Sequence, residues 1–145
     1  MSFADTERNR AAVHEAGHAL IAAARGLDVD LIELHRCDGE GGTSLREEPS
    51  KLDRVWVLYG GPFAEKVVFR KLTPNPVPPE LDELLLAHKL CAQIGIYETI
   101  EIRDQVEACL REQRASLELI AARLLEANMI KGTELDELLS ETPLR

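Results

Sequence analysis

The residues best suited to chemistry lie near the amino end, in the stretch His14-Glu15-Ala16-Gly17-His18. Apolar residues recur at helical spacing around it, which predicts a helix from about Glu7 to Ala24. Residues four apart share one face of a helix, with Cβ atoms about 5–6 Å from each other, so both imidazoles can reach one metal ion. Glu15 points roughly 100° around the helix from His14, where it reaches a water on the metal rather than the metal itself. This HExxH pattern predicts zinc on the two histidines and a glutamate that accepts the water proton.

The composition favours a single domain, residues 1–145, built mainly from packed helices with a small β-hairpin or sheet (α+β). Hydrophobic residues make up 45% of the chain but aromatic residues only 4%, so aliphatic side chains must fill the core. The formal net charge of −9 argues against nucleic acid as a partner, since that binding depends on neutralising phosphates. No apolar run approaches the roughly 20 residues that span a bilayer, so we expect no membrane partner. The widely spaced Cys37, Cys91 and Cys109 predict reduced thiols and a cytoplasmic location.

A strand is predicted to follow the first helix. The segment from Asp28 to Arg36 is rich in branched apolar residues, with Ile32 and Leu34 among its expected buried positions. A glycine-rich turn comes next, and Thr43 to Arg46 can return as a second strand. His35 is interpreted as an ordinary strand residue, because a lone histidine is more often structural than a metal ligand.

A second helix is predicted to open at Ser50, which can cap it, and to run through Val67. Gly60-Gly61-Pro62 interrupts its pattern, because a proline inside a helix costs about 3 kcal/mol or more. Two interpretations are open. The glycines can let the His14 helix pass very close around Gly17, or they can form a loop between two shorter helices.

After a proline-rich connector, Lys71 to Pro79, a helix is predicted from about Glu80 to Ile94. Asp82 and Glu83 fall in its first turn, where acidic residues are favoured by the helix dipole alone. One of them can instead supply a third zinc ligand from a separate helix. His88, later on the same helix, is expected to be exposed or packed rather than a ligand.

The remainder is predicted to be almost entirely helical. Apolar residues from Ile102 to Leu125 mark one or two long amphipathic helices. The pattern breaks between Asn128 and Gly132, and a short final helix is expected from Glu134 to Leu139.

Several of these blocks together resemble the zinc peptidase domain of FtsH-type AAA metalloproteases, in that family's order. The family usually has an arginine where this chain has Pro62. The matching blocks are the metal-binding helix (residues 11–26), the strand-turn-strand (30–45), the glycine-glycine helix (57–69), the helix that brings in the third ligand (80–96) and the C-terminal helical hairpin (112–139).

The resemblance implies zinc on His14 and His18, with Glu15 as the general base. The family's third ligand is an aspartate in the first turn of the later helix. Counting back from the apolar residues of that helix gives Glu83, whereas residue type favours its neighbour. We take Asp82 as the third ligand and Glu83 as its alternative.

The resemblance also indicates what this chain does not share with the family. It has no transmembrane segment and no ATPase module, so we expect a stand-alone domain that does not unfold its own substrates. The expected activity is that of a soluble zinc metallopeptidase acting on flexible peptides or unfolded proteins. A homo-oligomer and a separate ATPase partner are left open. The alternative function is a zinc-binding regulatory or protein-interaction module without catalytic activity.

Overall fold

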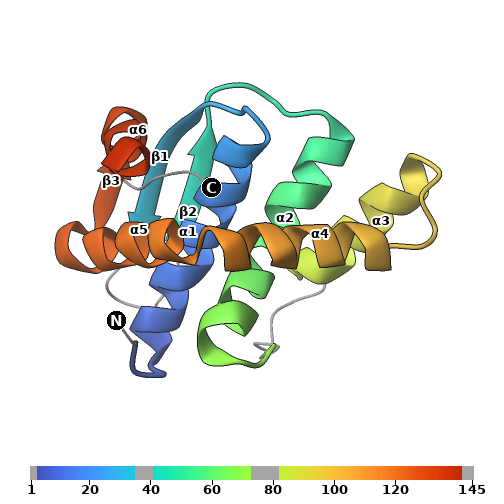
Figure 1. Ribbon diagram of the computed structural model, residues 1–145. Coiled ribbons are helices and arrows are strands. Elements are labelled where there is room, and N and C mark those ends of the chain that lie inside the picture. Colours follow the sequence, from blue (N-terminus) through green and yellow to red (C-terminus); the bar gives the residue numbers. More distant parts are fainter. Residues whose placement is uncertain (1–2, 35–40, 73–81, 142–145) are drawn as a thin grey trace.

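The computed structural model describes residues 3–34, 41–72 and 82–141 and is mainly helical with a small antiparallel sheet (Figure 1). This confirms the expected α+β class. No helix in the described part of the chain is both long and apolar enough to cross a bilayer. In chain order the elements are α1 (Glu7–Ala24), β1 (Val29–Leu34), β2 (Gly41–Leu45), α2 (Lys51–Phe69), α3 (Glu83–Gln93), α4 (Ile100–Glu112), α5 (Arg114–Ala127), β3 (Met129–Lys131) and α6 (Gly132–Glu141).

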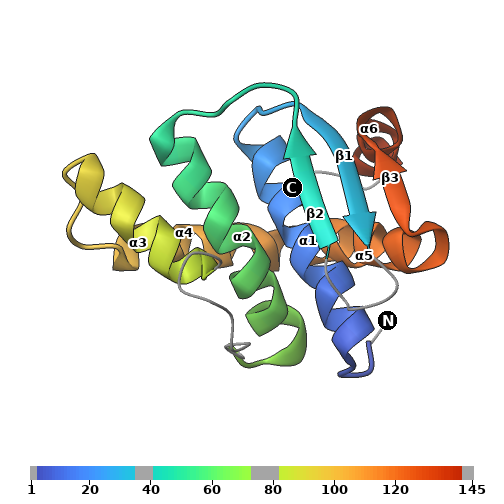
Figure 2. The same cartoon turned by 180° about the vertical axis from the view of Figure 1, so that it is seen from behind.

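The sheet has the strand order β2-β1-β3, and both pairings are antiparallel. Ile32 at the centre of β1 lies opposite Thr43 on β2 and Ile130 on β3, and its side chain is completely buried. Figure 2 shows α1 between this sheet and α2. On another side of the molecule, α5 packs against α1 and α4 packs against α2 (Figure 1). Helix α1 is therefore the centre of the core.

The two central helices touch backbone to backbone. A Cβ atom placed on Gly17 of α1 would lie only 2.2 Å from the carbonyl oxygen of Gly60 on α2. A Cβ atom on Gly60 would in turn lie 2.7 Å from the Gly17 carbonyl oxygen. Since real Cβ atoms do not approach other atoms so closely, glycine is required at both positions. This confirms the expected close passage of the two helices.

Helix α2 runs without a break through Pro62, so the alternative of two shorter helices joined by a loop is wrong. Proline has no N–H to donate to the carbonyl four residues earlier, and the helix loses that hydrogen bond. Its flanking residues Gly61 and Phe63 are buried, so packing on both sides of the proline holds the helix together.

The other predicted elements are found, and most of their bounds differ from the prediction by one or two residues. The third helix begins at Glu83 rather than Glu80, because the Asp82 side chain accepts hydrogen bonds from the backbone N–H groups of Leu84 and Leu85 and so caps it. The break after Asn128 contains the short strand β3, which pairs with β1. His35, Cys37 and most of the proline-rich connector lie outside the described residues.

Candidate metal centre

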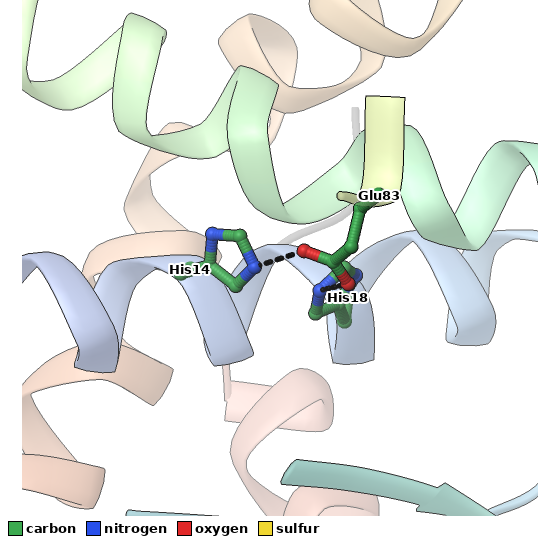
Figure 3. A group of neighbouring side chains, drawn as sticks. All are labelled: His14, His18 and Glu83. Atoms are coloured by element: carbon green, nitrogen blue, oxygen red, sulfur yellow. Dashed lines mark hydrogen bonds and ion pairs between the residues drawn. The ribbon is translucent and has the colours of Figure 1, made fainter. Parts of the chain in front are cut away.

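Three side chains from two helices converge on one point (Figure 3). His14 and His18 lie one turn apart on α1, with ring centroids 4.6 Å apart and ring planes almost perpendicular. Glu83, the first residue of α3, reaches both rings. Its Oε1 atom lies 2.5 Å from His14 Nε2, and its Oε2 atom lies 2.8 Å from His18 Nε2.

The other nitrogen of each imidazole contacts helix α2. His14 Nδ1 lies 2.6 Å from the Oε2 atom of Glu65, and His18 Nδ1 donates to the Val57 carbonyl oxygen at 2.6 Å. A carbonyl oxygen can only accept, so Nδ1 of His18 carries a proton. Partners of this kind fix the ring orientation and direct Nε2 towards a metal.

Charge holds the three groups together. Burial opposes the protonated form of His14, but the hydrogen bonds that this form donates to the Glu65 and Glu83 carboxylates raise its pKa to about 10. Burial likewise opposes protonation of His18. The negative charge of Glu83 outweighs this effect and raises the pKa of His18. The pKa of Glu83, which burial alone would raise, is lowered by the two histidines. A proton and a cation would therefore compete for the same nitrogen atoms of these two imidazoles.

Space in front of these nitrogens depends on a glycine of α2. A Cβ atom on Gly61 would lie 2.5 Å from His18 Nε2 and 2.6 Å from His14 Nε2. Any side chain at this position would lie against the Nε2 atoms of both histidines. The second glycine of the Gly60-Gly61 pair therefore keeps the site open, whereas the first permits the helix contact.

The donor set fits a divalent metal ion. One ligand atom each from His14, His18 and Glu83 lies within 4.8 Å of the other two. Two imidazoles and one carboxylate are a common set in catalytic zinc sites, which have three protein ligands and a fourth position for water or substrate. Zinc itself stays a prediction.

A cavity of about 470 Å³ opens beside this cluster. Glu15, His18 and Glu83 line it together with Thr43 of β2 and Val57 of α2. The Glu15 side chain is largely enclosed, with 7% of the residue exposed, and its Oε1 atom accepts a hydrogen bond of 3.0 Å from the Thr43 hydroxyl. Glu15 is not among the three converging residues, in agreement with its expected position around the helix.

Of the two candidates for the third ligand, the structure brings Glu83 to the histidines. The Asp82 carboxylate instead accepts hydrogen bonds from the backbone of α3, so our choice of Asp82 does not agree with this geometry. His88 is exposed, as expected. Sequence reasoning missed Glu65. Glu65 lies four residues after Gly61, on the face of α2 that packs against α1. A charged residue on a helix face made of small residues was the signal that could have indicated its role.

Comparison with known proteins finds a matching family and a similar zinc metalloprotease. Residues 10–73 match the family described as Peptidase M50B-like, and this segment includes both histidines, Glu15 and Glu65. The chain is also 28% identical, over 179 aligned positions, to the ATP-dependent zinc metalloprotease FtsH 1 of Symbiobacterium thermophilum. That alignment covers 97% of this chain and 30% of the relative's length. The matches confirm the expected resemblance to a zinc peptidase domain.

Proposed function

We propose that this chain is a zinc-dependent metallopeptidase that hydrolyses peptide bonds in the cavity beside His18. One observation carries the proposal. The candidate ligands His14, His18 and Glu83 meet at the wall of a cavity that also contains the carboxylate of Glu15. A metal site with a purely structural role has no need of an enclosed carboxylate beside it.

His14, His18 and Glu83 would hold the metal. When bound, zinc supplies a Lewis acid that polarises a carbonyl group and lowers the pKa of water to about 7. The residues behind the ligands keep that geometry fixed. Glu65 and the Val57 carbonyl hold the two rings, and Gly61 leaves the space in front of them clear.

Glu15 would act as the general base. Its carboxylate would accept a proton from the water that attacks the scissile carbonyl, and would then pass that proton to the leaving amine. Because Glu15 is largely enclosed, few solvent molecules compete for its oxygen atoms. The charge of the carboxylate also acts more strongly there than it would in bulk water.

The substrate would bind as an extended peptide along β2. This strand lies at one end of the order β2-β1-β3, and Gly42, Thr43 and Leu45 line the cavity. The edge of a sheet can pair with an added strand through main-chain hydrogen bonds. Flexible peptides or unfolded proteins suit this mode, and we propose a separate ATPase partner for folded substrates.

Substituting Glu15 with glutamine tests the catalytic proposal. Glu15→Gln keeps the shape of the side chain but removes the base, so hydrolysis of a peptide library should be lost while zinc content stays at the wild-type level. Wild-type cleavage should also stop when a chelator is added. An active Glu15→Gln protein would rule out this role. Zinc binding with no cleavage of any peptide by the wild type would instead favour the non-catalytic zinc module.

A further inference from the structure

We infer that Thr43 is a positioning residue that holds the Glu15 carboxylate in its working orientation. This inference rests on the proposed role of Glu15 as the base. The Thr43 hydroxyl lies 3.0 Å from Oε1 of Glu15 and 3.3 Å from the main-chain oxygen of the same residue. Within residues 3–34, 41–72 and 82–141, it is the one hydrogen-bond donor found for that carboxylate.

A glutamate needs such a partner because its side chain can rotate about several bonds. A general base works only within about 2.6–3.2 Å of the proton that it removes. A hydrogen bond to an ionised carboxylate is roughly twice as strong as one between neutral groups. One well-placed hydroxyl can therefore select a single orientation of Glu15, and the low exposure of this residue limits replacement of the hydroxyl by water.

The fold places the Thr43 hydroxyl independently of Glu15. Thr43 lies directly opposite the completely buried Ile32, so its position along β2 is fixed by the sheet. Its branched side chain has restricted rotation. Side chains alternate along a strand, and the next residue, Ser44, is exposed. Thr43 thus joins the strand beside the cavity to the helix that carries the base.

Three variants separate the hydroxyl from the rest of the side chain. Thr43→Val removes the hydroxyl and keeps the branched shape, Thr43→Ser restores a hydroxyl, and Ser44→Ala removes one from the neighbouring exposed position. In the zinc-loaded enzyme we expect Thr43→Val to lower kcat by about 10- to 100-fold, which is part of the roughly 10²–10⁴-fold that a general base contributes. KM and zinc content should stay close to wild type. Thr43→Ser should recover most of kcat, and Ser44→Ala should behave as wild type.

A measurement that needs no activity decides the inference by itself. Scalar couplings in isotope-labelled protein report the side-chain rotamer of Glu15 with zinc bound. We expect one rotamer in wild type, Thr43→Ser and Ser44→Ala, and averaging over several in Thr43→Val. If Thr43→Val fails to fold, Thr43→Ala takes its place. A single Glu15 rotamer without the hydroxyl would overturn the inference. An inactive wild type would count against the proposed function, and the couplings would still decide the role of Thr43.

Discussion

His14 lies between two carboxylates, with Glu65 at Nδ1 and Glu83 at Nε2. A proton on Nε2 and a metal ion therefore compete for the same nitrogen atom. In the metal-free protein the proton is strongly favoured, because these carboxylates raise the pKa of His14 from 6.5 to about 10 against the opposing effect of burial. The carboxylates that prepare the site for a cation thus also stabilise the protein without one.

The stability of the metal-free protein should depend on pH accordingly. A histidine whose pKa is raised in the folded protein stabilises the fold fully when the pH is below the pKa of the unfolded chain. The contribution of His14 to the free energy of unfolding should therefore fade as pH rises from 6.5 to about 10. The lowered pKa of Glu83 acts at the other end, with a contribution present above its ordinary value of 4.5 and lost as pH falls. The unfolding temperature without metal should therefore be highest between these two ordinary values.

Zinc should offset the loss of stability at higher pH, because it binds the deprotonated imidazoles. The increase in unfolding temperature on adding zinc should grow between pH 6 and pH 8. Thermal unfolding followed by circular dichroism, with and without zinc, measures this. A zinc effect that does not change with pH would contradict the competition between proton and metal.

At the scale of elements, two adjacent glycines of α2 have different roles where this helix contacts α1. Gly60 permits the backbone contact with Gly17, and Gly61 leaves room in front of the histidines. The sequence alone indicated the contact, since small residues occur on both helices. It did not separate the two roles, because that depends on which face of α2 each glycine occupies once the helices are packed.

Gly61→Ala should remove the metal site while leaving the fold intact. The added methyl group would lie against Nε2 of both imidazoles, where a metal would bind, so we expect zinc affinity to fall at least tenfold, within the effect known for disturbed metal surroundings. Helix α2 should not weaken, since alanine favours a helix by about 1 kcal/mol over glycine. Gly42→Ala is a matched control, because a Cβ atom there meets nothing within 4 Å. Equal zinc affinity in the two variants, measured by competition with a chelating dye, would contradict this role.

The choice between Asp82 and Glu83 shows where prediction at this scale ends. Both were placed in the first turn of the third helix, and a carboxylate of either type can bind zinc. The helix begins one residue after Asp82, whose side chain caps it and is therefore used locally. A shift of one residue turns a side chain by about 100°, so the ligand depends on a helix boundary that spacing alone does not fix.

Over the whole molecule, the candidate site joins parts of the chain that are far apart in sequence. Helix α1 is the buried centre of the core, whereas α3 fully buries only Ala87 and Cys91. The position of α3 should therefore depend on the link from Glu83 to the histidines as well as on its packing against α2.

Removing zinc should loosen α3 first. Amide hydrogen exchange at pH 8 should speed up in α3 after chelation, because the ion pair of Glu83 with His14 and His18, which remains, should stabilise α3 less than a bound metal ion does. Helix α5, which buries five residues including Leu117 and Ile120, serves as the internal reference and should change less. Equal changes in α3 and α5 would show that the metal does not act through this link.

The sequence predicted best where local patterns decide the outcome. The bounds of α1 followed from apolar spacing, and the two histidines followed from their spacing on that helix. Strand β3 was missed, because three residues carry little pattern and form a strand only by pairing with β1. Glu65 was missed for a related reason, since its partner His14 is 51 positions away.

Zinc content tests the central claim most directly. Wild-type protein, Glu83→Ala and Asp82→Ala should be purified without added metal and analysed by mass spectrometry for zinc bound per chain. Wild type and Asp82→Ala should both contain zinc, although the second loses a helix cap worth about 1 kcal/mol, and Glu83→Ala should contain almost none. Zinc retained by Glu83→Ala at the wild-type level, or lost from a folded Asp82→Ala, would contradict a metal centre built from His14, His18 and Glu83.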